Sequence, residues 1–168
     1  MLNLTDKDWD TAFQWYLIPF IILTLLLSLF VLTKPARAEE VDISIIIQIE
    51  SGGNPNAYNK HSGAIGLMQI TPICLKEYNQ RYSSKEIWVR PEEIYDYCYN
   101  TKIGSWYINK RIPELLCHYR LPDTIDNRLI AYNFGIGNLI KYKQGKRKLP
   151  QETINYLRKY HKLERRKK

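Results

Sequence analysis

An almost unbroken aliphatic run, ISIIIQI, ends at a single acidic residue, Glu50, and the pair Gly52 and Gly53 comes shortly after it. A run this apolar predicts a helix over residues 41–51 that is buried on several sides, with Asp42 as its N-cap and the glycines as its stop. A carboxylate set against so much aliphatic surface is poorly solvated when charged, so its pKa is expected to rise. Glu50 is therefore a candidate general acid, although its position alone favours an exposed residue at a helix end.

The segment after Glu50 supports the catalytic interpretation. Residues 51–76 contain no Asp or Glu, but they hold four glycines and many uncharged polar side chains. Glycines let a backbone approach a ligand closely, and amides and hydroxyls bind the hydroxyl and acetamide groups of sugars. An ordinary glycosidase needs two carboxylates, but one suffices if the substrate supplies its own nucleophile. A second carboxylate would have to fold in from a distance, and Glu92, Glu93 and Asp96 are the candidates.

Apolar residues recur at helical spacing nearly everywhere, which predicts a mainly α class with at most a small β element. Residues 54–69 hold too many turn formers for a helix, so we expect a loop there with a short strand pair. Further helices are expected at 71–82, from residue 91, and at 100–116, where Pro113 would bend or end the helix. Another should begin at Asp123 or Thr124 and run through residue 132. After an interruption at Gly135 and Gly137 the helix should resume over 136–143, and the last helix is expected at 150–161.

Three short motifs occur in order along the chain: residues 49–52 (IESG), 66–69 (GLMQ) and 131–135 (AYNFG). Together they resemble the ordered motifs of the family 1 lytic transglycosylases, which are lysozyme-like enzymes with an SLT domain that cleave peptidoglycan glycan strands. Weaker similarities to the same family lie at Asn100, Gly104 and Tyr107, and at residues 150–156, which resemble its last, tyrosine-bearing motif. The resemblance covers residues 41–160 and implies a lysozyme-like fold.

The resemblance also implies a reaction. Glu50 would protonate the glycosidic oxygen between MurNAc and GlcNAc, and would then act as base on the 6-hydroxyl of the same MurNAc. The product would carry a 1,6-anhydroMurNAc end, and no protein nucleophile would be required.

Substrate contacts are implied for six further residues: Ser51, Met68, Gln69, Tyr132, Asn133 and Tyr156. The resemblance places Tyr132 opposite the acid and within hydrogen-bond reach of Glu50. Judged from residue type and position alone, Ser51 fits a helix-end cap as well as a substrate contact. Met68 fits the core better than a contact, and Tyr132 could be a core residue with a satisfied hydroxyl.

Two other functions stay open on the sequence. One is a true muramidase that hydrolyses the same bond with water. The other is a wall-binding assembly module without catalytic activity, which the presence of Glu50 within an otherwise intact motif set argues against. Analysis of the cleavage products separates the two enzymatic functions, because hydrolysis leaves reducing MurNAc ends and the lytic reaction leaves anhydro ends.

Residues 15–32 form an almost purely apolar segment, long enough to cross a bilayer or to form the core of a signal peptide. The tripeptide at 36–38 (ARA) suits signal peptidase. The region before the segment is acidic, however, and Lys34 and Arg37 lie after it, which is the wrong charge bias for exporting the C-terminal part of the chain. Because cell-wall substrate demands export, we expect residues 1–38 to be a signal peptide or membrane anchor. Residues 39–168 would then be the lysozyme-like domain, with a basic C-terminal tail.

The chain carries a net charge of +8, with much of the excess near its C-terminus. No recognised nucleic-acid motif accompanies this charge, and we expect no nucleic-acid partner. Peptidoglycan stem peptides carry carboxylates, which gives a basic wall enzyme an electrostatic rationale. We therefore expect a periplasmic or cell-envelope location, with peptidoglycan strands as the partner and the inner membrane as a second one if the N-terminal helix is retained. The size and layout resemble enzymes that serve envelope-spanning secretion, conjugation or phage machines.

Three cysteines, Cys74, Cys98 and Cys117, permit one disulfide in an exported chain. If residues 100–116 are helical, Cys98 and Cys117 lie about 25 Å apart by helical rise, which is beyond the limit of about 7 Å for a bridge. Cys74 would then pair with one of the other two, and we favour Cys98. The histidines have no metal-ligand spacing with the cysteines, so neither a metal nor another cofactor is expected.

Overall fold

The computed structural model describes residues 20–25, 39–82 and 88–167, in two units that divide after Arg37. In the first unit only an exposed helical stretch at residues 20–25 is described. Most of the predicted signal peptide or anchor at 1–38 therefore lies outside the described residues. Among the residues that are described, no helix combines the length and the apolarity needed to cross a bilayer.

The second unit begins with the predicted buried helix, α2 (Ile43–Glu50). Asp42 caps its N-terminus by accepting a hydrogen bond from the Ser44 amide, as predicted. Ile45 and Ile46 are fully withdrawn from solvent and lie in the central apolar core. The aliphatic run is therefore helical because burial of its side chains outweighs the modest helix propensity of isoleucine.

The segment after α2 forms the predicted loop with a strand pair, β1 (Tyr58–Asn59) and β2 (Ala64–Ile65), which run antiparallel. Gly66 closes this hairpin with a positive φ of 78°, and a β-carbon there would lie 2.2 Å from the side-chain nitrogen of Asn100. Only glycine fits such a position, because it tolerates both the left-handed backbone and the close approach.

Helices α3 (Pro72–Arg81), η1 (Pro91–Tyr95), α4 (Tyr97–Trp106) and α5 (Ile112–His118) come next along the chain. A single π-helical segment, η2 (Tyr107–Arg111), joins α4 to α5. The expected bend at Pro113 is thus replaced by a widened helix that continues through the proline. Because proline has no N–H to offer the preceding turn, the wider π spacing lets the helix continue without that hydrogen bond.

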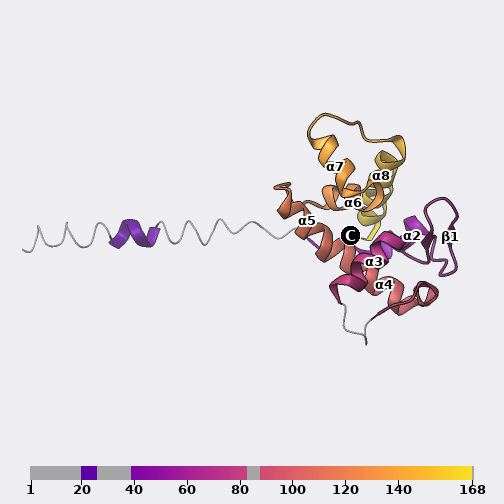
Figure 1. The fold of residues 1–168 in the computed structure, drawn as a ribbon. Helices are drawn as coiled ribbons and strands as arrows, with labels where there is room; N and C mark the ends of the chain where they lie inside the picture. Colours follow the sequence, from indigo (N-terminus) through magenta and orange to yellow (C-terminus); the bar gives the residue numbers. More distant parts are fainter. Residues whose placement is uncertain (1–19, 26–38, 83–87, 168) are drawn as a thin grey trace, which may run out of the picture. The chain divides into compact units, whose positions relative to one another are not determined.

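The C-terminal helices are α6 (Ile125–Phe134), α7 (Ile136–Lys143) and α8 (Gln151–Lys167). Thr124 caps α6, and Gly135, with a φ of 86°, separates α6 from α7. Gly137, expected to interrupt the helix as well, lies inside α7. In Figure 1 these three helices lie on one side of the domain, and α3, α4 and β1 lie on the other. The mainly helical class with a small β element is confirmed.

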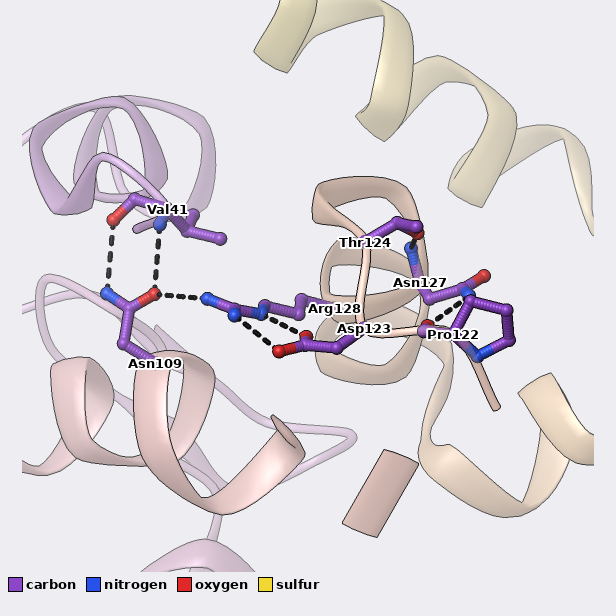
Figure 2. A network of polar contacts seen from close by, with 7 residues as sticks. All are labelled: Val41, Asn109, Pro122, Asp123, Thr124, Asn127 and Arg128. Carbon is purple, nitrogen blue, oxygen red and sulfur yellow. Dashed lines mark hydrogen bonds and ion pairs between the residues drawn. The ribbon is translucent and has the colours of Figure 1, made fainter. Parts of the chain in front are cut away.

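A buried polar network joins α6 to the start of α2 and to η2 (Figure 2). The Arg128 guanidinium is only 1% exposed and bonds both oxygens of Asp123, at 2.6 and 2.7 Å. It also donates to Asn109 Oδ1 at 3.3 Å. Asn109 in turn bonds the backbone N–H and C=O of Val41 at 2.9 and 3.2 Å. This network fixes the position at which the chain enters α2.

The predicted disulfide between Cys74 and Cys98 is not formed, since all three cysteines are free thiols. Cys74 lies in the core on the buried face of α3, whereas Cys98 is exposed in the first turn of α4. One sulfur faces the interior and the other faces solvent, so the two cannot approach each other without unpacking α3. Burial also raises the pKa of the Cys74 thiol, which keeps it protonated.

Candidate active site

Glu50 is the last residue of α2 and opens onto a cavity of about 540 Å³. Its carboxyl group accepts a hydrogen bond from the Tyr156 hydroxyl at 2.8 Å, a contact between α2 and α8. Burial raises the pKa of Glu50 to about 7, the Tyr156 hydrogen bond lowers it, and the nearby charge of Glu152 raises it. No described residue forms an ion pair with Glu50, so the carboxyl can exchange a proton near neutral pH.

The cavity is lined by residues from α2, β1, the loop after β2, α6 and α8. Most of them are polar, and four carry carboxamides: Ile49, Glu50, Asn59, Gln69, Asn133, Glu152, Asn155, Tyr156, Arg158 and Lys159. Of the sequence-predicted residues, the structure brings together Glu50, Gln69, Asn133 and Tyr156 around this one cavity. The carboxamides beside Glu50 suit the hydroxyl and acetamide groups of a glycan.

The loop that carries Gln69 is held in place by α4. Asn100 accepts a hydrogen bond from the Met68 amide at 2.8 Å and donates to the Ile65 carbonyl at 2.9 Å. The Met68 side chain is fully buried, and it packs so closely on Gly104 that a β-carbon there would lie 2.4 Å from its sulfur. Met68 is therefore a core residue, and its backbone N–H and C=O bond Asn100 and Tyr132.

Tyr132 differs from its predicted place. The residue was expected within hydrogen-bond reach of Glu50, but its hydroxyl donates to the Met68 carbonyl at 2.7 Å. The tyrosine that bonds Glu50 is Tyr156, from α8. Tyr132 is nevertheless close enough for the Glu50 charge to raise its pKa, with burial as the larger cause. Tyr132 therefore bonds the backbone of the loop that carries Gln69, while Tyr156 bonds the Glu50 carboxyl.

Ser51 joins the end of α2 to the same loop. Its hydroxyl lies 2.9 Å from the Leu67 carbonyl and 3.2 Å from the Ile47 carbonyl, and it accepts from the Gly53 amide. It does not line the cavity beside Glu50. These contacts match the helix-end role that the residue type alone suggested, and they fix the direction in which Glu50 leaves the helix.

Gln69 and Asn133 both line the cavity with amide side chains. Gln69 has an unusual positive φ of 50°, and its side chain donates to the Gly66 carbonyl at 3.0 Å. Asn133 Oδ1 accepts a hydrogen bond from the Thr153 hydroxyl at 2.7 Å. The Asn133 NH₂ group is left without a bond to any described residue, so it is available to a ligand acceptor.

Glu152 lies within the last sequence motif, but it was not among the candidates for a second carboxylate near Glu50. Those candidates make other contacts: Glu92 and Glu93 pair with Arg90, and Asp96 caps α4. Glu152 instead lines the cavity from the first turn of α8.

The signal for Glu152 was present in the sequence, four residues before Tyr156, which places the two side chains on one helix face. Within the described ranges, no group of three or more His, Cys, Asp or Glu side chains converges to hold a metal ion.

Comparison with known proteins gives a family match. The model of the transglycosylase SLT domain matches residues 32–155. The endo-type membrane-bound lytic murein transglycosylase A of Cronobacter sakazakii is 32% identical over 116 residues, which cover 68% of this chain and 57% of the relative.

The membrane-bound lytic murein transglycosylase E of Buchnera aphidicola is also 32% identical, over 73% of this chain and 55% of the relative. The matches thus span little more than half the length of these relatives. The search of solved structures gives no significant match.

Proposed function

Because the chain belongs to the transglycosylase SLT domain family, we propose that it is a peptidoglycan lytic transglycosylase that cleaves the β-1,4 bond between MurNAc and GlcNAc. The observation that carries the proposal is Glu50, a carboxyl with a pKa of about 7 and no described counter-ion, in a cavity lined by amides. The names of the matched relatives, which are lytic murein transglycosylases, support the same reaction.

In the proposed mechanism the protonated Glu50 acts first as an acid. Its proton passes to the glycosidic oxygen, the bond from that oxygen to the MurNAc anomeric carbon breaks, and GlcNAc leaves with a free 4-hydroxyl. Because Tyr156 already donates to Oε1, the second oxygen carries the proton. The same hydrogen bond stabilises the carboxylate that remains, since charge-assisted hydrogen bonds are the stronger ones.

Glu50 then acts as a base in the second half of the reaction. The carboxylate removes the proton of the MurNAc 6-hydroxyl, whose oxygen bonds to the anomeric carbon of the same sugar. The product is a 1,6-anhydroMurNAc end, and the acid is regenerated without consumption of water. An attacking group within the substrate has a high effective molarity, so no protein nucleophile is needed.

Substrate positioning falls to the walls of the cavity. Gln69 and the free NH₂ of Asn133 line the cavity and are suited to hold the acetamide and hydroxyl groups of the sugars. Tyr156 contacts both the acid and the cavity. Ser51 and Tyr132 act indirectly, because their hydroxyls bond the backbone of the loop that forms the opposite wall.

Because of Glu152, the hydrolytic reaction has to be tested as an alternative. A muramidase would need a second carboxylate to activate water, and Glu152 shares the cavity with Glu50. It also raises the Glu50 pKa, which favours the protonated acid and is a sufficient role in the lytic reaction. In a muramidase Glu152 would activate water, whereas in a lytic transglycosylase it would only raise the pKa of Glu50.

Digestion of purified sacculi in ¹⁸O-labelled water, followed by mass spectrometry, tests the proposal. We expect muropeptides that are unlabelled and one water lighter than hydrolysis products. Predominant label at reducing MurNAc ends would make the enzyme a muramidase, and Glu152→Gln should then abolish the labelled product. Absence of any released muropeptide would favour the remaining alternative, a wall-binding module without activity.

The family also supports a location in the cell envelope. Two matched relatives are named as membrane-bound, which supports an envelope location for this chain too. Residues 1–38 would direct export, either as a cleaved signal peptide or as an inner-membrane anchor. A role in local wall opening for a secretion, conjugation or phage apparatus remains part of the proposal. Fractionation of cells and N-terminal sequencing of the mature protein test the location and the cleavage.

A further inference from the structure

The cavity beside Glu50 has a basic edge formed by Arg158 and Lys159 of α8. Both residues are exposed, and neither forms an ion pair with any described residue. The cavity's two carboxylates, Glu50 and Glu152, make no ion pair with them either. Cations that line a ligand cavity without a protein partner are available to an anionic group of the ligand.

The two cations line the cavity further along α8 than Tyr156, the residue that bonds Glu50. Along α8, Lys159 lies three residues after Tyr156, so both lie on the face that meets the cavity, with Lys159 one turn further out. The basic edge therefore meets a part of the substrate beyond the sugar that Glu50 protonates.

The glycan backbone offers these cations hydrogen-bond acceptors but no anionic partner, since its sugar hydroxyls and acetamides are uncharged. The carboxylates of peptidoglycan lie on the peptide stems, which are attached to the lactyl group of MurNAc. We propose that Arg158 and Lys159 bind stem-peptide carboxylates of a strand held in the cavity, and so select strands that carry charged stems. This inference rests on the proposed function, because it assumes that the cavity holds peptidoglycan.

General attraction of a basic protein to an anionic wall is the competing explanation. Lys162 and Arg165 lie on the same helix and are also exposed, but they do not line the cavity. A double substitution there removes the same charge from the same helix. Comparing Arg158→Gln/Lys159→Gln with Lys162→Gln/Arg165→Gln therefore separates local recognition from overall charge.

The test uses soluble glycan strands with intact stems, and the same strands after their carboxylates are converted to amides. With intact stems, Arg158→Gln/Lys159→Gln should raise KM about five- to tenfold and leave kcat within about twofold, because exposed charge pairs contribute modestly. On amidated strands the wild type and this variant should behave alike. The control pair Lys162→Gln/Arg165→Gln should match the wild type on both substrates.

Equal losses on both substrates, or equal losses in the control pair, would overturn the inference. So would an unchanged KM on intact stems. A binding measurement separates this inference from the proposed function, since full-length protein carrying Glu50→Gln can bind both kinds of strand without cleaving them. Tighter binding of intact than of amidated strands, lost with Arg158→Gln/Lys159→Gln, supports stem recognition even if the cleavage products prove to be hydrolytic.

Discussion

Arg128 and Glu50 are both charged residues set against the core, but their surroundings differ. The Arg128 guanidinium bonds both oxygens of Asp123 and reaches Asn109, so its charge is compensated (Figure 2). Glu50 has a single tyrosine donor and no described cation, and burial raises its pKa to about 7. A compensated buried charge can stay ionised within the fold, whereas an uncompensated one is free to change its protonation state. The difference distinguishes a structural site from a catalytic one.

Replacing the uncompensated acid should have the largest effect. Glu50→Gln keeps the shape of the side chain but removes the proton, and we expect cleavage of peptidoglycan to fall by about 10² to 10⁴-fold. Release of soluble muropeptides from sacculi measures the loss, and circular dichroism checks that the variant is folded. Turnover near the wild-type value in this variant would remove Glu50 from the mechanism.

Breaking the compensated pair should affect stability instead. Asp123→Ala leaves the buried Arg128 without its carboxylate, and we expect the free energy of unfolding to drop by about 3 kcal/mol. Denaturant unfolding of the wild type and the Asp123→Ala variant measures this loss of stability. Asp126→Ala on the next turn is the control: its carboxylate is exposed and pairs with His161 at 2.7 Å, so its loss should change stability by less than about 1 kcal/mol. Equal effects of the two substitutions would mean that the network does not hold the entry into α2.

The acid that we propose to be catalytic should also make the fold less stable at high pH. The folded-state pKa of Glu50, about 7, lies above its ordinary value of 4.5. The folded protein thus retains a proton that the unfolded chain releases, so this stability is fully present below about pH 4.5 and is lost as pH rises through 7.

The difference between the folded-state and ordinary pKa of Glu50 corresponds to about 3 kcal/mol of folding free energy. We reduce this to about 2 kcal/mol, because the carboxyl opens onto the cavity and is partly screened by solvent. Glu50→Gln should therefore be more stable than the wild type by about 2 kcal/mol at pH 8, and by little at pH 4.5. Unfolding curves at the two pH values measure this. A variant that is less stable at pH 8 would show that Glu50 is compensated in the fold, as Arg128 is.

Smaller effects should come from the two neighbours of Glu50, and in opposite directions. Tyr156→Phe removes a hydrogen bond that lowers the Glu50 pKa, so the fall in activity at high pH should move to higher pH. Glu152→Gln removes a charge that raises the pKa, so the fall should move to lower pH. We expect each shift to be about half a pH unit to one unit, measured in pH–rate profiles. Shifts in the same direction would contradict this account of the site.

The helical class, the Asp42 cap and the role of the run before Glu50 could be predicted because they depend on local pattern and burial. Residues 54–69 were recognised as a loop for the same reason. The identity of the tyrosine that bonds Glu50 could not be predicted, because Tyr132 and Tyr156 lie on different helices and only their packing decides which one reaches the acid. Glu152 was missed as an acid because only Tyr156 of the same motif was given a role, although the two residues lie one turn apart on α8.

The disulfide prediction failed for a related reason. It was based on the rise along one helix. That rise excludes a Cys98–Cys117 pair, but it does not indicate which side of a helix faces the core. Cys74 faces inward and Cys98 outward, and only the packing of α3 and α4 sets this. Local spacing thus predicted the elements of the site better than it predicted contacts between them.

The central claim is that Glu50 holds its proton near neutral pH while the protein is folded. A carbon-13 NMR titration of the glutamate carboxyl groups tests it directly, with Glu50→Gln used to assign the signal. The account predicts one carboxyl that titrates with a pKa of about 7, and whose signal is missing in the variant. A Glu50 signal that titrates at or below its ordinary value of 4.5 would contradict it.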